Sequence, residues 1–266
     1  MKIQRFTPTT ILQPYIYQYY LAEGDFGAST RDVFFADGCI EMVFNIGLDF
    51  YKDDQKESWA KLIGQITQPL AVRATGKGKS FGIWFTPHGF SRFSNIPANE
   101  FTNRTVPLEL VFDQHFIDSV GEYLSGNNIQ GLLHALNLYF EKSAMTSSTG
   151  LKDQIAGYSS DRLLNNSEET DLNLLANTCN VSQRYLQKIF RDSIGIAPKQ
   201  LQRVSRFQKA LHQITESPRV PFTAVTYDAG YYDQSHFIRE FKAFTGFKPS
   251  DYHLRNHPIN QYFLKG

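Results

Sequence analysis

The pattern of hydrophobic and polar positions divides the chain into two parts near residue 108. Before that point, apolar residues occur in short runs, and in residues 33–44 two such runs flank Asp37 and Gly38. This spacing predicts a strand, a turn and a second strand. Another apolar run covers residues 80–85, so residues 1–106 are predicted to be mostly β-structure. Four glycines are interpreted as further turns: Gly64, Gly76, Gly78 and Gly82.

After residue 108 the apolar residues recur at helical spacing. Leu132, Leu136 and Phe140 repeat every four residues and predict an amphipathic helix. Residues 143–150 are small, polar and without periodicity, and we interpret them as a loop or linker. The helical pattern then resumes and continues to Tyr252.

The C-terminal part contains an internal repeat at a separation of 51 residues. The matched positions carry identical or similar side chains, and they include Phe, Gly and Pro at fixed offsets. Two copies indicate a duplicated unit, because a solenoid needs at least about three. The matched pairs are Gln183 and Gln234, Lys188 and Arg239, Phe190 and Phe241, Arg191 and Lys242, Gly195 and Gly246, Pro198 and Pro249, and Leu201 and Tyr252.

The first copy has the pattern of a helix-turn-helix unit. A short apolar helix face is followed by a turn at residues 178–180, in which Asn180 tolerates a left-handed conformation. Ser182 is a suitable N-cap for a second helix, which Gly195 and Pro198 would end. Its inward side would carry Leu186, Ile189 and Phe190.

The second copy repeats this pattern, with Gly230 in the turn and Asp233 as N-cap. Its turn is one residue longer, because the first helices align at a separation of 50. Between the copies, residues 198–214 form a continuous helical pattern, with Val204, Phe207, Leu211 and Ile214 on one face. A stiff connector would hold the two second helices about 34 Å apart, which is one turn of DNA.

The outward faces of the two second helices carry side chains that suit DNA. Arg and Lys donate to guanine, Gln pairs with adenine, and Ser adapts to either base. More distant polar groups contact phosphates and set the register. The predicted base contacts are Gln183, Arg184, Gln187, Lys188, Gln234, Ser235 and Arg239. The predicted phosphate contacts are Ser182, Arg191, Asp233, His236 and Lys242.

Composition and charge agree with this hypothesis without deciding it. Hydrophobic residues make up 41% and charged residues 20%, which excludes a disordered chain. Residues 168–266 hold 13 Lys and Arg against 9 Asp and Glu, whereas residues 1–167 hold 14 against 17. No apolar run reaches the roughly 18 residues of a membrane span. A basic C-terminal part on an acidic N-terminal part suits a nucleic-acid-binding domain attached to another domain.

Residues 171–252 resemble the DNA-binding domain of the AraC/XylS family of bacterial regulators. The most specific match covers residues 229–242 with Gly246 and residues 249–252, and residues 181–190 with Gly195 and Pro198 also fit. The resemblance implies base contacts at Arg184, Gln187, Lys188, Gln234, Ser235 and Arg239. Thr226 stands where the family usually has Ala, which predicts looser packing there. Cys179-Asn180 replaces the commoner glycine-containing turn.

The N-terminal half is similar to the sensor-type domain that precedes this module in one AraC-like subgroup. The similar pieces are residues 36–47, 85–89 and 97–100. The resemblance implies a bacterial, cytoplasmic regulator of transcription that binds double-stranded DNA. It leaves open a small-molecule effector, a homodimer, a contact with RNA polymerase, and the choice between activator and repressor.

The predicted fold class is α+β: a β-rich, barrel-like N-terminal domain with helices, followed by an all-α domain with two helix-turn-helix units. The predicted boundaries are 1–147 for the N-terminal sensor or dimerisation domain and 148–167 for a linker and lead-in helix. Residues 168–266 would form the DNA-binding domain and bind DNA alone.

Two enzyme hypotheses stay open beside the regulator. A DNA-directed repair enzyme with this kind of module needs a metal-activated cysteine cluster, and only Cys39 lies upstream. A small-molecule enzyme with a barrel-like domain needs ligands such as His-x-His, which the sequence lacks. We therefore expect no catalytic residue, no metal and no cofactor. Cys39 is interpreted as a small buried thiol, with a redox sensor as the alternative.

Overall fold

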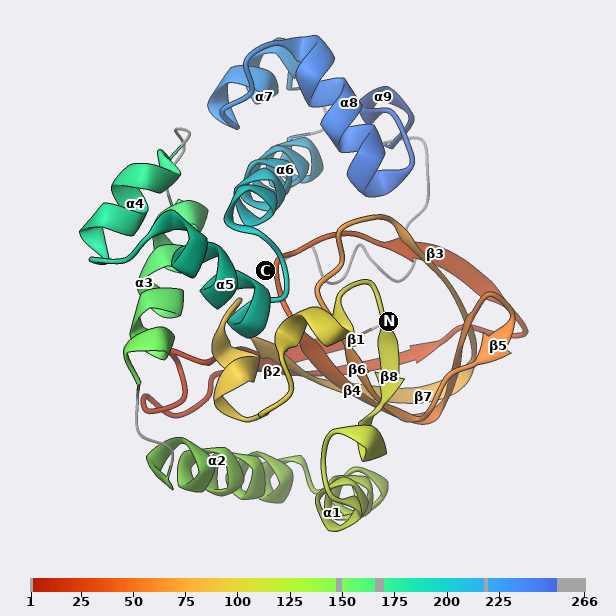
Figure 1. Cartoon of the computed structure of the whole chain (residues 1–266). Helices are drawn as coiled ribbons and strands as arrows, with labels where there is room; N and C mark the ends of the chain where they lie inside the picture. Colours follow the sequence, from red (N-terminus) through yellow and green to blue (C-terminus); the bar gives the residue numbers. More distant parts are fainter. Residues whose placement is uncertain (1, 147–149, 166–169, 218–219, 253–266) are drawn as a thin grey trace.

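The computed structural model of the chain describes residues 2–146, 150–165, 170–217 and 220–252 (Figure 1). The N-terminal part forms one antiparallel sheet of eight described strands, which confirms the predicted β-rich domain. The sheet order is β1-β2-β7-β4-β6-β8, with β3 paired to β7 and β5 paired to β4. The strands are β1 (Lys2–Phe6), β2 (Ile16–Asp25), β3 (Thr30–Phe34), β4 (Glu41–Lys52), β5 (Gln55–Lys56), β6 (Ala60–Ile63), β7 (Leu70–Phe85) and β8 (Thr105–Pro107).

The 16-residue strand β7 organises the sheet. One edge of β7 pairs with β4 along most of its length, and the other edge is shared between β3 and β2. The two strands predicted in residues 33–44 therefore exist, but β3 pairs with β7 instead of closing a hairpin with β4. The turn between them closes no hairpin, because β7 supplies partners for both strands. Residues 35–38 connect these two strands and contact another part of the chain.

Three of the four glycines interpreted as turns lie inside β7, so that prediction is also wrong. Gly82 shows the reason. A Cβ atom on Gly82 would lie 2.0 Å from the Tyr20 ring, which packs directly over this position of the strand. Glycine in a strand interior often marks such a close approach.

Helices α1 (Gln114–Ser125) and α2 (Ile129–Thr146) cover one face of the sheet (Figure 1). Together they enclose the largest core cluster, which includes Phe44, Phe81 and Phe140. The short 3-10 helices η1 (Gly89–Arg92), η2 (Ala98–Phe101) and η3 (Leu108–Leu110) complete this domain. Helix α2 continues to Thr146, so residues 143–146 are helical and not the predicted linker; residues 147–149 lie outside the described residues.

Two smaller cores build the C-terminal part, one around each helix-turn-helix unit. Helix α3 belongs to the first core, because Ile155, Ala156 and Leu163 are buried against residues of the first unit. A fragment beginning at residue 168, the predicted start of the C-terminal domain, would lose that helix and its contacts with this core. The helices are α3 (Leu151–Asn165), α4 (Leu172–Thr178), α5 (Gln183–Ser193), α6 (Pro198–Glu216), α7 (Phe222–Asp228), α8 (Gln234–Thr245) and α9 (Pro249–Tyr252).

Candidate nucleic-acid interface

The first helix-turn-helix unit consists of α4 and α5, joined by a turn at residues 179–182. Asn180 adopts the left-handed conformation expected for it, with a φ of 53°. The Ser182 hydroxyl is the N-cap of α5 and accepts a hydrogen bond from the Tyr185 backbone N–H at 3.2 Å. Satisfying this free N–H group defines where α5 begins. The predicted cap and turn are confirmed.

Helix α5 is strongly amphipathic. Leu186, Ile189 and Phe190 are fully buried, as the helical period predicts. The opposite face is open to solvent, and it carries every polar side chain that the sequence assigned to DNA on this helix: Gln183, Arg184, Gln187, Lys188 and Arg191.

The second unit, α7 and α8, repeats this geometry. Its turn spans residues 229–233 and is one residue longer than the first, as predicted. Gly230 occupies the left-handed position of the turn with a φ of 82°. The Asp233 carboxylate caps α8 by accepting from the His236 backbone N–H at 2.7 Å. Thr226 is fully buried, and its hydroxyl donates to the Phe222 carbonyl at 2.6 Å; the looser packing expected there stays a prediction.

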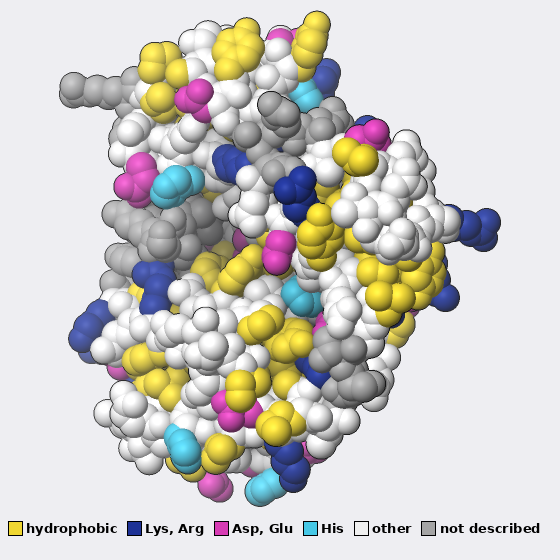
Figure 2. All heavy atoms as spheres, turned by 90° about the vertical axis from the view of Figure 1, so that its left-hand side faces the viewer, with side chains coloured by type: hydrophobic (Ala, Val, Ile, Leu, Met, Phe, Trp, Pro, Cys, Tyr) yellow, Lys and Arg dark blue, Asp and Glu magenta, His cyan; other side chains and the backbone are white. Residues whose placement is uncertain are grey.

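The outward face of α8 is exposed at Gln234, Ser235, Arg239 and Lys242. His236 is different, because its ring is partly covered and packs edge-on against Tyr231, with 5.3 Å between ring centroids. Basic side chains elsewhere are scattered. On the side of the molecule that bears α3 and α4, Lys and Arg side chains are interspersed with apolar ones (Figure 2). The regular polar faces of the two helices therefore mark the interface better than overall charge does.

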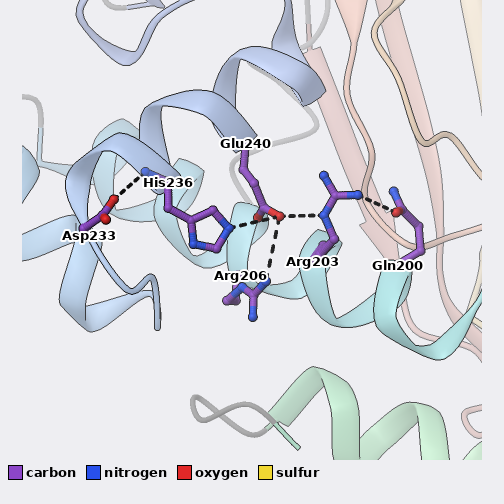
Figure 3. Close-up of polar contacts among 6 residues, drawn as sticks. All are labelled: Gln200, Arg203, Arg206, Asp233, His236 and Glu240. Carbon is purple, nitrogen blue, oxygen red and sulfur yellow. Dashed lines mark hydrogen bonds and ion pairs between the residues drawn. The ribbon is translucent and has the colours of Figure 1, made fainter.

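A buried carboxylate, which the sequence analysis missed, links α8 to the connector α6. The Glu240 side chain is only 6% exposed, and its Oε1 accepts from Arg203 Nε at 2.5 Å (Figure 3). Arg206 lies 3.8 Å and His236 Nε2 3.6 Å from the same oxygen. The repeat contained a signal for this cluster, since Glu240 aligns with the buried Ile189 and is therefore a charge at an inward position.

The connector α6 runs unbroken from Pro198 to Glu216, as the sequence predicted. Its residues Val204, Phe207 and Leu211 are fully buried. Pro198 lies in the first turn, where its missing N–H costs nothing. A continuous helix of this kind fixes the two units relative to each other.

The N-terminal domain is attached to both units. The Phe35 ring from the segment after β3 contacts Phe207 and Tyr252, with centroid separations of 6.3 and 6.0 Å, and so completes the core of the second unit. Beside it, the Gln208 amide donates to the Ala36 carbonyl. At the first unit, the Thr102 hydroxyl donates to the Gly195 carbonyl at 2.7 Å. The sequence pattern did not predict these contacts.

The N-terminal domain also buries ionisable groups. The Tyr20 hydroxyl donates to Glu41 at 2.5 Å, and burial raises the pKa of Glu41 to about 8. Burial likewise raises the pKa of Asp37 to about 6 and lowers the pKa of Lys61, which pairs with Glu57. The pKa of the free Cys39 thiol is raised by burial and by nearby carboxylates, which favours the unreactive thiol form.

Among the described residues, no group of three or more His, Cys, Asp and Glu side chains could hold a metal ion. Among the described helices, none is long and apolar enough to cross a membrane.

Two protein families match the chain. The family described as "Domain of unknown function (DUF6597)" matches residues 4–107, and the family described as "Helix-turn-helix domain" matches residues 175–255. The comparison with curated proteins finds no match.

Several solved structures are similar to the chain. ToxT from Vibrio cholerae O395 is 13% identical over 93% of this chain and 98% of its own, with a TM-score of 0.46. The DNA-binding domain of AdpA, a global transcriptional factor in complex with a target DNA, is 21% identical over 39% of this chain and 89% of its own, with a TM-score of 0.33. The C-terminal domain of AraT, a response regulator from Geobacillus stearothermophilus, is 25% identical over 41% of this chain and 89% of its own, with a TM-score of 0.34.

The family match coincides with the two units described above. The matched residues 175–255 include the end of α4, all of α5 and α6, and the whole second unit. Both units have the turn, the N-cap and the exposed polar second helix that DNA binding requires. Residues 175–255 therefore form a helix-turn-helix domain with two such units.

Proposed function

We propose that the protein recognises a specific double-stranded DNA sequence by placing α5 and α8 in successive major grooves of one duplex. The observation that carries this proposal is the repeated arrangement of the two helices. Each begins at a side-chain N-cap, buries its apolar side and exposes its polar side at matched positions. A helix fits the major groove, and the connector α6 would hold the pair at a fixed spacing.

We assign the base contacts to Gln183, Arg184, Gln187, Lys188, Gln234, Ser235 and Arg239, all of which are exposed. Arg191 and Lys242, one turn further along each helix, would contact phosphates. Ser182 and Asp233 are the N-caps of α5 and α8. They would contribute to phosphate binding through the backbone N–H groups at those N-termini, which they orient. His236 would reach a phosphate only through its exposed edge.

The test is selection of duplexes from a random pool with the full-length chain, followed by binding measurements on the selected sequence. Replacing Gln234 or Arg239 by Ala should cost about 1–3 kcal/mol and relax the preference at one base pair. Gln183→Ala and Lys188→Ala are the matched variants in the first unit and should relax a position about one helical turn away. An equal loss on every sequence would identify phosphate contacts instead, and failure to enrich any sequence would refute specific recognition.

We further propose that the N-terminal domain controls DNA binding, either through a small-molecule effector or through homodimerisation. Phe35 and Thr102 supply the physical link, because each joins this domain to one helix-turn-helix unit. Buried ionisable groups such as Glu41 are unusual unless they serve a ligand or a network. A shift of thermal stability with one compound from a metabolite library, or a concentration-dependent mass, would distinguish the two routes.

We also propose that the protein acts in the cytoplasm of a bacterium, contacts RNA polymerase and has no catalytic activity. The alternative, an enzyme with a DNA-binding module, predicts a bound metal. Metal analysis of the purified protein distinguishes them, because a stoichiometric metal ion would favour the enzyme.

A further inference from the structure

A hollow of about 590 Å³ lies between the connector α6 and helix α8. Its walls include Lys199, Arg203 and Arg206 from α6, and His236, Arg239 and Glu240 from α8. We call it the α6–α8 cleft. Figure 3 shows part of its lining, with the side chains of Arg203, Arg206 and His236 directed toward Glu240.

The charge of this lining is unbalanced. Four permanent cations, Lys199, Arg203, Arg206 and Arg239, face a single carboxylate, Glu240. The Nε atom of Arg206 and the Oε2 atom of Glu240 are both buried and have no hydrogen-bond partner within the described structure. A concave surface lined by charges of one sign focuses the electric field and concentrates ions of the opposite sign. The cleft therefore has the properties of an anion site.

The depth of each group determines how an anion would meet it. Glu240 is deeply buried, with 6% of its side chain exposed, whereas Arg203 is 34% exposed and Lys199 is open to solvent. An entering anion would reach Arg203 and Lys199 before the carboxylate. Glu240 is then a positioning residue, because its ion pair holds the Arg203 guanidinium toward the cleft. A planar guanidinium suits phosphate, to which it can donate two parallel hydrogen bonds.

The cleft lies between the start of the connector α6 and the helix α8. Its α6 wall begins just after the end of α5, and its α8 wall includes Arg239 on the outward face. If α5 and α8 occupy successive major grooves, the sugar-phosphate strands that separate those grooves must pass this surface. We propose that the α6–α8 cleft receives a backbone phosphate of the DNA between the two grooves. This inference rests on the proposed mode of DNA binding and adds a contact that neither helix makes alone.

The experiment measures binding of the full-length chain to the selected duplex and to a scrambled duplex between 50 and 200 mM KCl. Each phosphate contact contributes about 0.9 to the slope of log affinity against log salt. Lys199→Gln should therefore lower that slope by about one and weaken both duplexes by the same factor. Lys142→Gln, which removes an exposed charge from α2, is the matched control and should leave the slope unchanged. Lys199→Arg should restore it.

A second measurement identifies the phosphate itself. Single phosphates of the selected duplex are replaced by uncharged methylphosphonates. The replacement should lower the affinity of the wild-type protein at one or two positions between the two contacted grooves. The same replacements should not lower the affinity of the Lys199→Gln variant any further. A slope for Lys199→Gln equal to that of the wild type, or a loss confined to the selected sequence, would overturn the inference while leaving specific DNA binding intact. Absence of wild-type binding to any duplex would instead refute both proposals.

Discussion

Removing the Phe35 ring is the sharpest test of the coupling between the two domains. Phe35 belongs to the N-terminal sheet domain by sequence, yet it is 4% exposed and packs within the core of the second helix-turn-helix unit. Phe35→Ala would leave a cavity against Phe207 and Tyr252, and no residue of the helix-turn-helix units themselves would be mutated. The variant therefore perturbs that domain only through the contact between the two parts.

The magnitude follows from the size and burial of the ring. Replacing a buried Phe by Ala costs about 3–5 kcal/mol, because transfer free energy is lost and the cavity relaxes incompletely. With a urea dependence of about 1–3 kcal/mol per molar, the midpoint for the helical domain should fall by about 1 M or more. The control Leu110→Ala removes a side chain that is 68% exposed and should change the free energy of unfolding by less than about 0.5 kcal/mol.

Urea unfolding is followed by two spectroscopic signals, one for each domain. Both tryptophans, Trp59 and Trp84, lie in the N-terminal part, so their fluorescence follows the sheet domain. Far-UV circular dichroism follows mainly the helices. In Phe35→Ala the circular dichroism transition should move to lower urea and approach that of an isolated fragment of residues 150–266, which lacks Phe35 altogether. A transition that stays at the wild-type midpoint would refute the coupling.

Three further predictions follow from single positions. Asp233→Ala removes the N-cap of α8 and should lower the free energy of unfolding by about 0.5–2 kcal/mol, measured by urea denaturation, whereas Asp233→Asn should retain most of it. Glu41 has a pKa raised from 4.5 to about 8, so the folded state binds its proton more tightly and this group's stabilisation is lost as pH rises from 4.5 to 8; relative to Glu41→Gln, the wild type should become less stable across that window, and parallel stability curves would contradict this. Gly195→Ala and Gly246→Ala both strain a left-handed residue, with φ of 95° and 80°, but only at Gly195 would the new methyl lie 3.0 Å from the Ala98 carbonyl; the larger loss in thermal stability should therefore occur at Gly195, and equal losses would argue against the domain contact.

The sequence by itself determined the C-terminal units almost completely. Their helices, turns and caps depend on interactions within about five residues, such as Ser182 with Tyr185 or Asp233 with His236. Such local interactions can be predicted directly from the sequence, because both partners lie within a few residues of each other. The internal repeat supplied further evidence, because each position could be compared with its counterpart 51 residues away, as for Gly195 and Gly246.

Only the tertiary structure decided how distant segments meet. The sequence predicted β3 and β4 as strands but not that both pair with β7, because strand partners depend on the whole sheet and not on the turn between them. It likewise contained no sign that Phe35 completes the core of the second unit, since an apolar residue after a strand is compatible with any buried surface. The α6–α8 cleft arises in the same way, from side chains of two helices that approach each other only after the cores have formed.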